Sequence, residues 1–481
     1  MPDQPNIIFI FPDQWRGDSM SCLGHPVAET PFIDQLAAEG TTFTSAYTNC
    51  PVCIPARACL VTGQTPNTAG RFGYRDGYPW PYPDTFMRLL RDGGYQTMLS
   101  GKTHFHPPRA RLGFEEMALY DNQRPNPDFK SDYDRWLERM TNGMICDTAQ
   151  DLHSNSQLVH PWTHDEALHA NSWTVTAAID MLERRDPTRP FFLQVNFHRP
   201  HPPYDPPIEY FRRFDDAELP ELPEGDWLGS RFNHDEQRID QIFGRMDKRL
   251  SDRARRAYYA QLNHLDFQIG RLLRWLQIRR MDHDVLVVFS SDHGEMLGDH
   301  RLYRKSCAFE GSAHVPLIIR PPKSWDVSRH QTTDKPVALH DIAPTLLEAG
   351  KVEIPSLMEG KSLLSLLGQN APDTWRESVH LEQNHGPLGA WQCLTDGHSK
   401  YIWHTQSGEE LLFDLDHDPQ ECHNLTDDPQ YADILASYQD QLAVILGARE
   451  EDDFVENGKL KPGYVSPVAR PWIIEGNHAH S

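Results

Sequence analysis

The stretch PNIIFIFPDQ, residues 5–14, is an unbroken apolar run that ends in a proline, an aspartate and a glutamine. A short apolar run of this kind is typical of a strand buried on both faces of a parallel sheet. Further runs of the same character are YQTMLS (95–100), FFLQVNF (191–197), DVLVVFS (284–290) and VPLIIR (315–320). Segments with helical periodicity alternate with them, at residues 31–40, 83–94, 165–185, 252–279 and 340–350. This alternation predicts an α/β fold with a large, mainly parallel sheet sandwiched by helices.

The character of the chain changes after about residue 365. Residues 399–425 read as short antiparallel strands joined by tight turns, and residues 429–446 read as an amphipathic helix. We therefore predict a large α/β domain over residues 1–365 and a smaller sheet-plus-helix domain with a tail over residues 366–481. Two long polar stretches, 105–165 and 199–250, are predicted to be insertions over one face of the larger domain.

The overall composition and charge of the chain argue against some classes of binding partner. The chain has 481 residues and a formal net charge of −23, which disfavours nucleic acid or an anionic membrane surface as partner. The first residues, MPDQPNIIFIF, lack a basic region and a cleavage site, and no apolar run approaches the roughly 20 residues that span a bilayer. Eight cysteines are too few for a disulfide scaffold of this length. These features predict a cytoplasmic protein.

Polar residues follow four of the predicted strands at the point where each strand ends. They are Asp13 and Gln14, Lys102 and His104, His198 and His201, and Asp292 and His293. Each of them alone could be an ordinary turn or loop residue. In an open α/β sheet, however, ligands bind at the carboxyl edge of the strands, so these residues are predicted to converge on one site.

The residue types at this edge indicate a reaction class. Asp13, Gln14, Asp292 and His293 together offer the oxygen and nitrogen ligands of a divalent cation. Positive charge and proton donors would come from Arg57, Lys102, His104, His201 and Lys305. A metal surrounded by cations suits an oxyanion whose charge grows in the transition state, which predicts phosphoryl or sulfuryl transfer. The sequence contains no dinucleotide-binding, Walker or nucleophile-elbow motif.

The segment NCPVCIPARACLVTGQ, residues 49–64, concentrates three cysteines, Cys50, Cys53 and Cys59. Cys53 could be half of a disulfide, a zinc ligand with Cys50, or a thiolate nucleophile. A zinc or redox motif in a binding protein would need a fourth ligand, which the neighbouring sequence lacks. Soft sulfur suits a hard cation poorly, and an oxygen nucleophile would fit this site better. Cys50 and Cys59 are predicted to be small buried apolar residues.

The block Cys53-Ile54-Pro55-Ala56-Arg57, continuing to Thr62-Gly63, resembles the signature of formylglycine-dependent (type I) sulfatases of the alkaline phosphatase superfamily. The resemblance extends over most of the chain. It includes residues 5–14, GKTHFH (101–106), SSDHGEMLGDH (290–300) and the hairpin at 410–425. It implies that a formylglycine-generating enzyme oxidises Cys53 to formylglycine, whose hydrate supplies the oxygen nucleophile.

The resemblance also implies a role for each site residue. The metal ligands would be Asp13, Gln14, Asp292, His293 and the modified Cys53. Arg57 would orient the aldehyde hydrate, and Lys102 and Lys305 would hold the sulfate oxygens. His201 would protonate the leaving oxygen, with His198 as the other candidate in the same motif. His104 would help to deprotonate the second hydroxyl, so that sulfate is expelled.

Two residues depart from the commonest sulfatase pattern. Gln14 stands where an aspartate is usual, and His293 stands where an asparagine is usual. Ca²⁺ is the family default, and Mn²⁺ becomes an alternative at this less acidic site. The same combination also resembles phosphonate monoester hydrolases. We therefore predict a sulfatase that acts on a small organic sulfate ester, with a phosphonate monoester or phosphodiester hydrolase as the alternative.

The sequence leaves the roles of two further segments undecided. In the loop RFGYRDGYPWPYP (71–83), Arg71, Arg75 and Trp80 could contact the substrate or could be packing residues. The tail KPGYVSPVARPWII (461–474) is a candidate for covering the site or for making subunit contacts in a homo-oligomer.

Overall fold

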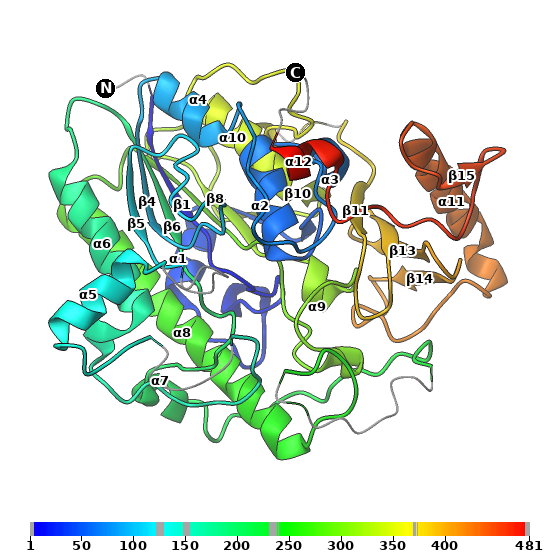
Figure 1. Cartoon of the computed structure of the whole chain (residues 1–481), viewed down its shortest axis with the longest axis horizontal. Coiled ribbons are helices and arrows are strands. Elements are labelled where there is room, and N and C mark those ends of the chain that lie inside the picture. Colours follow the sequence, from blue (N-terminus) through cyan, green and yellow to red (C-terminus); the bar gives the residue numbers. More distant parts are fainter. Residues whose placement is uncertain are drawn as a thin grey trace.

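The computed structural model describes residues 4–121, 129–147, 154–229, 238, 240–368, 372 and 374–476. In these ranges a sheet of eight strands, in the order β5-β4-β6-β1-β7-β8-β2-β9, forms the centre of the molecule (Figure 1). The strands span β1 Asn6–Ile10, β2 Thr41–Phe43, β4 Gln96–Gly101, β5 Glu116–Leu119, β6 Phe191–Asn196, β7 Val285–Ser290, β8 Leu317–Arg320 and β9 Gln331–Thr333. The four strands predicted to end in polar residues are neighbours in this order.

The central part of the sheet is parallel, as predicted. Strand β1 pairs in parallel with β6 on one side and with β7 on the other, so that Ile8 lies opposite Leu193 and Val287. Strand β4 pairs in parallel with β6 and with β5. The predicted strand near 315–320 runs the other way, because β8 is antiparallel to β7. Ile7 to Ile10 are fully buried, which explains their continuous apolar sequence.

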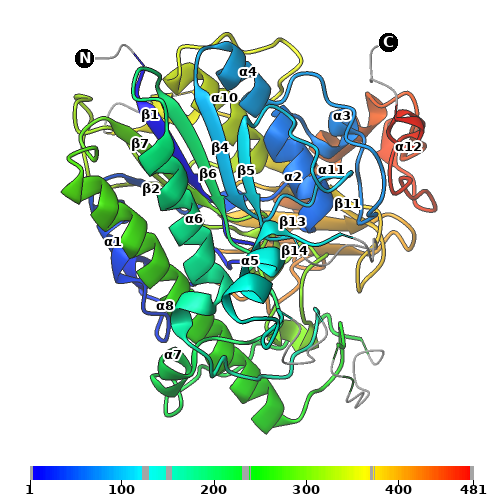
Figure 2. The same cartoon turned by 60° about the vertical axis from the view of Figure 1, so that its left-hand side comes forward.

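Helices cover both faces of the sheet. Figure 2 shows α1, α6 and α8 on one side and α2, α4 and α10 on the other. They span α1 Pro31–Ala38, α2 Cys53–Thr62, α4 Phe86–Asp92, α6 Ala170–Arg184, α8 Lys248–Ile278 and α10 Ile342–Ala349. The apolar cores on the two faces are separate, because alternate residues of each strand point to opposite sides. The layered arrangement confirms the predicted fold class.

The helix predicted at 165–185 is interrupted. A 3₁₀ turn covers Glu166–Leu168, and α6 begins only at Ala170. The imidazole of His169 accepts a hydrogen bond from the backbone N–H of Asn171, so it caps α6 and ends the preceding turn. The remaining short elements of the main body are α3 Pro66–Ala69, α5 Asp132–Met140, α7 Ile208–Arg212, α9 Glu310–Ala313, β3 Ala46–Tyr47 and β10 Val337–Ala338.

A second, antiparallel sheet lies beside the main body (Figure 1). Its four strands are β11 Val379–Gln383, β12 Trp391–Thr395, β13 Ser399–His404 and β14 Glu410–Asp414, and α11 Ala432–Gly447 packs on it. The short elements that follow are β15 Val455–Glu456, β16 Lys459–Leu460 and α12 Pro471–Glu475. Lys400 of β13 is buried and bonds Glu310 at 2.6 Å and Glu421 at 2.8 Å, which joins this sheet to α9. The domain boundary at residue 365 stays a prediction.

The tail does not cover the carboxyl edge of the main sheet. Ala469 pairs with Arg71 in an isolated β-bridge, and Arg470 bonds Oδ1 of Asn67 in α3 at 2.7 Å. The tail therefore lies along the segment that follows α2, and its role in subunit contacts stays a prediction. The predicted insertions at 105–165 and 199–250 fall partly outside the described residues.

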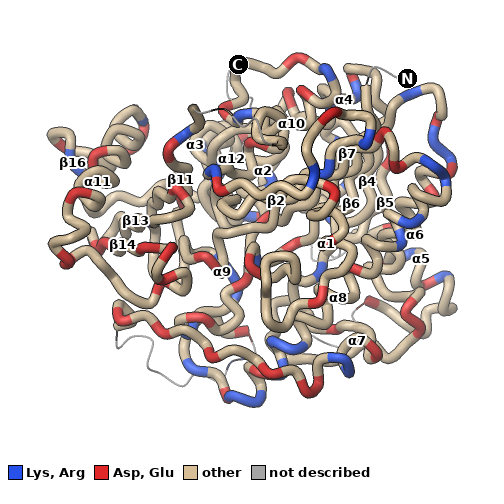
Figure 3. Tube along the Cα trace, turned by 180° about the vertical axis from the view of Figure 1, so that it is seen from behind, with Lys and Arg blue, Asp and Glu red and all other residues tan. Residues whose placement is uncertain are grey.

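Acidic and basic residues are interspersed along most of the described chain in the view from behind (Figure 3). The net charge of −23 disfavours a polyanionic partner. Among the described residues, no helix combines the length and the apolar character that crossing a bilayer requires.

Candidate active site

The exits of three strands are joined by hydrogen bonds. The backbone N–H of Asp13 donates to the carbonyl of Phe197 at 3.1 Å, and the carbonyl of Asp13 accepts from the N–H of His201 at 3.1 Å. These bonds join the end of β1 to the end of β6. Gln14, which has a φ of 75°, donates its N–H to Oδ1 of Asp292 at 3.1 Å, which joins β1 to β7. Residues far apart in sequence are thereby fixed at one edge of the sheet.

Helix α2 presents its first turn to this edge. Cys53 is the first residue of α2, and its Sγ lies 3.2 Å from Nε2 of His293 and 3.8 Å from Oδ1 of Asp13. Arg57 lies one turn further along and therefore on the same face of the helix. Its Nη2 lies 3.1 Å from Oδ2 of Asp13 and 3.0 Å from Oδ2 of Asp292. The guanidinium thus bridges two carboxylates, which are both fully buried.

Four of these side chains form a group that fits a metal ion. One ligand atom from each of Asp13, Cys53, Asp292 and His293 lies within 4.8 Å of the others, and all four residues are buried. Nδ1 of His293 bonds the carbonyl of Gly294 at 2.9 Å, so Nδ1 carries the hydrogen and the lone pair of Nε2 faces the group. Two carboxylates and an imidazole lone pair are a suitable donor set for a divalent cation.

The other two cysteines of the signature segment do not belong to this group. Cys50 and Cys59 are fully buried, and burial raises the pKa of both thiols well above the usual value. The sulfur of Cys50 lies 3.6 Å from the carbonyl oxygen of Phe72, and Cys59 belongs to the apolar core on the α2 face of the sheet. Both are therefore small buried residues, as the sequence predicted.

Cations surround the buried carboxylates. Nζ of Lys102 lies 2.7 Å from Oδ2 of Asp13, and Nζ of Lys305 donates to Oε1 of Gln14 at 2.5 Å. Burial by itself would raise the pKa of Asp13, but the charges of Lys102 and Arg57 outweigh it and hold that pKa well below the usual range. Burial, with help from Asp13, raises the pKa of the Cys53 thiol to about 11. The unmodified Cys53 is therefore a protonated thiol at neutral pH.

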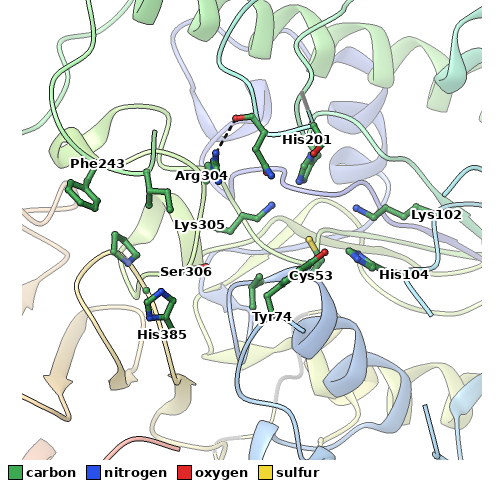
Figure 4. Close-up of a pocket in the computed structure, with 16 residues that line it drawn as sticks. Cys53, Tyr74, Lys102, His104, His201, Phe243, Arg304, Lys305, Ser306 and His385 are labelled. Carbon is green, nitrogen blue, oxygen red and sulfur yellow. Dashed lines mark hydrogen bonds between the residues drawn. The ribbon is translucent and has the colours of Figure 1, made fainter. Parts of the chain in front are cut away.

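The predicted histidines occupy different places. Nδ1 of His201 bonds the carbonyl of Pro202 at 2.7 Å, and burial, reinforced by Lys305, holds the pKa of His201 well below its usual value. His198 packs behind His201, with ring centroids 5.0 Å apart, and against Tyr120. His104 has a φ of 64°, and its Nε2 lies 3.9 Å from Oδ2 of Asp76. Figure 4 shows His104 next to Cys53 and Lys102, and His201 above them.

These residues form the inner end of a cavity of about 470 Å³. The residues at its inner end are Cys53, Lys102, His104, His201 and Lys305, and those of its outer wall include Tyr74, Ile242, Phe243, Arg304, His385 and Pro387. In Figure 4, Phe243 and His385 lie on the side of the pocket away from Lys102 and His104. Sequence reasoning found the inner end and missed the outer wall.

The loop at residues 71–83 contributes to the pocket through a residue that the sequence did not single out. Tyr74 lines the cavity. Arg71 instead stacks on Trp80, with Cζ 4.9 Å from the ring centroid, and bonds the hydroxyl of Tyr82 at 3.0 Å. Arg75 lies over the ring of Tyr78. Arg71 and Trp80 are therefore packing residues.

A protein-family model described as Sulfatase matches residues 5–352, and a second, described as N-sulphoglucosamine sulphohydrolase, C-terminal, matches residues 298–446. The first match covers the sheet, both helix layers and the exits of all four site strands. The chain belongs to the sulfatase family, and it is a hydrolase of the alkaline phosphatase superfamily, as the signature at Cys53 predicted.

Particular relatives resemble the chain over nearly its whole length. An arylsulfatase from Clostridium perfringens (strain 13 / Type A) is 36% identical over 474 residues, which cover 96% of this chain and 98% of that protein. A choline-sulfatase from Rhizobium meliloti (strain 1021) is 30% identical over 503 residues, covering 97% and 94%. The solved structure of a phosphonate monoester hydrolase of Agrobacterium radiobacter superposes with a TM-score of 0.75 at 24% identity, covering 97% of this chain and all of that one, which shows a shared fold.

Proposed function

We propose that this sulfatase hydrolyses small organic sulfate esters with an oxygen nucleophile made from Cys53. The position of Cys53 carries the proposal: it begins a buried helix, 3.2 Å from His293, at the inner end of the cavity. As a protonated thiol with a pKa of about 11, it is neither a good nucleophile nor a good ligand for a hard cation. Oxidised to formylglycine, the same side chain would supply a hydrate oxygen in its place.

The metal centre that we propose consists of Asp13, Gln14, Asp292 and His293 together with modified residue 53. The fit rests on the buried donor group and on the lone pair that His293 directs toward it. Ca²⁺ is our first choice, and Mn²⁺ is the second because an amide and an imidazole replace harder oxygen ligands. When bound, the cation would withdraw electrons from the oxygens that it contacts.

We assign Lys102 and Lys305 to the sulfate oxygens of the ester, and Arg57 to the aldehyde hydrate of residue 53. Lys102 and Lys305 line the inner end of the cavity, and Arg57 lies against Asp13 and Asp292. All three are buried, and the low dielectric of their surroundings strengthens their electrostatic interactions. The carboxylates of Asp13 and Asp292 offset part of this positive charge. Negative charge that develops on the ester oxygens during cleavage would be stabilised by Lys102 and Lys305.

We assign the proton transfers to the two histidines that line the cavity. His201 is neutral in the free protein because its pKa is lowered, and an anionic ester beside it raises that pKa, so it can deliver a proton to the leaving oxygen. His104 lies beside Cys53 in the lining of the cavity, and we assign to it the proton that residue 53 releases as sulfate leaves (Figure 4). His198 lies behind His201 and has no direct role in this scheme.

The outer wall favours an apolar alcohol. Tyr74, Ile242, Phe243 and Pro387 provide apolar surface, and the described residues that line the cavity include no carboxylate. A cationic alcohol such as choline would find no counter-charge there, whereas an aromatic ring would bury apolar area. We therefore propose an aryl sulfate, and we expect 4-nitrophenyl sulfate to be hydrolysed with a much higher kcat/KM than choline sulfate. The reverse order would contradict this substrate class.

A phosphonate monoester is the second candidate, because Gln14 and His293 depart from the usual sulfatase ligands. Such an ester also carries one negative charge and would meet the same two lysines. The test is to measure kcat/KM on phenyl sulfate and on phenyl phenylphosphonate with one metal-loaded preparation. We expect the sulfate to be the better substrate. If the phosphonate is hydrolysed faster by orders of magnitude, the second candidate replaces the first.

The proposal requires one partner, a formylglycine-generating enzyme that acts on Cys53 before or during folding, because Cys53 is 2% exposed in the folded chain. A cytoplasmic location remains our proposal. It is supported by the eight cysteines, which form no disulfide in the structure, as expected in a reducing compartment.

A further inference from the structure

The side-chain amide of Gln14 is held between a buried carboxylate and a buried ammonium group. Its Nε2 donates a short hydrogen bond to Oε2 of Glu295, and its Oε1 accepts from Nζ of Lys305 at 2.5 Å. Gln14 is fully buried, and Glu295 is 2% exposed. Because an ionised carboxylate can only accept and an ammonium can only donate, these two neighbours admit a single orientation of the amide.

Glu295 is itself held firmly. Its Oε1 accepts from the backbone N–H of Leu297 at 3.0 Å and from the N–H of Arg304. The backbone of Gln14 is fixed as well, since its N–H bonds Asp292 and its carbonyl accepts from the hydroxyl of Tyr258 at 2.8 Å. The orientation of the Gln14 amide is therefore the remaining degree of freedom, and Glu295 and Lys305 determine it.

The orientation of an amide at position 14 must be fixed if its oxygen is to bind a cation, whereas a carboxylate at that position could bind in either orientation. The two oxygens of an aspartate are equivalent, but a glutamine has one end that binds cations and one end that repels them. Lys305 holds the oxygen end only until an anionic ester competes for its ammonium group. Glu295 is not among the described residues that line the cavity, so an ester bound there would not compete directly for its contact with Nε2.

We propose that Glu295 is a positioning residue of the metal centre. It keeps Nε2 of Gln14 turned toward itself and Oε1 turned toward Lys305, so that the oxygen is the end of the amide available to a cation, and it places next to Gln14 the negative charge that a glutamine lacks. This inference rests on the proposed metal centre. Glu295 follows the predicted metal ligands Asp292 and His293 closely in the sequence. The sequence alone, however, does not show that its side chain contacts Gln14.

An exchange of the two side chains tests the inference, because glutamine and glutamate have the same shape. Glu295→Gln leaves one acceptor oxygen to serve both the Gln14 amide and the backbone N–H groups of Leu297 and Arg304, so one donor loses its partner. Gln14→Glu alone brings two buried carboxylates together. In the double variant Q14E/E295Q every donor again meets an acceptor, with the polarity of the contact reversed.

The measurement is calorimetric titration of Ca²⁺ into chelator-stripped, matured protein, with circular dichroism to follow folding. We expect E295Q to weaken Ca²⁺ affinity by about 10- to 100-fold. In the Q14E background we expect the same substitution to strengthen Ca²⁺ binding, because it removes a repulsion. Glu353→Gln, an exposed carboxylate elsewhere, is the matched control and should leave affinity unchanged. If Glu295 is purely structural, E295Q should lower the stability of the metal-free protein but leave the Ca²⁺ affinity of the folded protein unchanged.

The outcomes separate the two proposals. If the wild-type protein binds neither Ca²⁺ nor Mn²⁺, the metal centre itself fails. If it binds Ca²⁺ and E295Q binds equally well, or if E295Q has the same effect in both backgrounds, only the role of Glu295 fails. Should E295Q not fold, the double variant decides: recovery of both fold and Ca²⁺ binding supports the inference, and loss of both contradicts it.

Discussion

The inner end and the outer wall of the cavity are built in different ways. The inner end comes mainly from strand exits and the first turn of α2, with Lys305 added by the segment between β7 and α9. Buried hydrogen bonds join the exit of β1 to those of β6 and β7. The outer wall comes from loops, with Tyr74 after α3, Phe243 before α8, and other residues from the segment between β11 and β12. The inner end can therefore hold one chemistry constant while the outer wall varies with the substrate.

The largest expected effect is at Cys53. Cys53→Ala removes the precursor of the nucleophile, and we expect kcat/KM on 4-nitrophenyl sulfate to fall by at least about 10⁴-fold. Cys59→Ala is the matched control, since Cys59 lies in the same helix but in the apolar core. Steady-state kinetics on both variants measure the difference. A Cys53→Ala protein that retains a tenth of the activity would contradict the proposed nucleophile.

The next effect is at Lys102. Replacing it by methionine removes one of the three cations and leaves Asp13 with Arg57 as its remaining ion-pair partner. We expect kcat to fall by about 10²- to 10³-fold, the usual cost of losing one preorganised electrostatic contact. Lys323→Met serves as control, because Lys323 pairs with Asp282 on the surface. Equal activity in the two variants would exclude Lys102 from the sulfate site.

A smaller effect of a different kind is expected at the outer wall. Phe243→Ala should raise KM for 4-nitrophenyl sulfate by about tenfold and leave kcat within about twofold, because it removes binding shared by substrate and transition state. Phe243→Leu, which keeps apolar bulk, should recover most of the affinity. If Phe243→Ala lowers kcat instead of raising KM, the proposed division between inner end and outer wall is wrong.

The smallest expected effect concerns the unmodified Cys53 thiol, which we expect not to react with an alkylating reagent. In protein made without the maturation enzyme, the Cys53 thiol has a pKa of about 11, so only a minute fraction is thiolate at about pH 8, and that fraction grows as the pH rises. We expect iodoacetamide to label exposed Cys146 and to spare Cys53 at this pH, as read by peptide mass spectrometry. Labelling of Cys53 as fast as Cys146 would favour the thiolate alternative.

The difference between strand exits at the inner end and loops at the outer wall also explains which parts of the site the sequence could predict. Buried parallel strands have a distinctive apolar sequence, so β1, β4, β6 and β7 and the residues after them were readable, and their pairing follows from topology. The antiparallel direction of β8 could not be predicted, because a short apolar run does not indicate which way the strand runs in the sheet. Ile242 and Phe243 lie in a polar stretch without periodicity, and only the folded loop brings them to the cavity.

Glu295 illustrates a further limit. It lies two residues after His293, yet its importance depends on a hydrogen bond to a residue more than two hundred positions away. Local patterns identify the type of residue and its place on an element, whereas such a contact is decided by the packing of two loops. His104 and His201 were found because they follow strands directly, and their roles stay proposals.

The most direct test of the proposed nucleophile is the mass of the peptide that carries Cys53, from protein produced together with a formylglycine-generating enzyme. We predict that residue 53 has lost its sulfur and two hydrogens and gained one oxygen, and that the peptide forms an oxime with hydroxylamine. An unmodified cysteine, in a preparation where the same enzyme has converted a control sulfatase, would contradict the proposal and return Cys53 to the thiol alternatives.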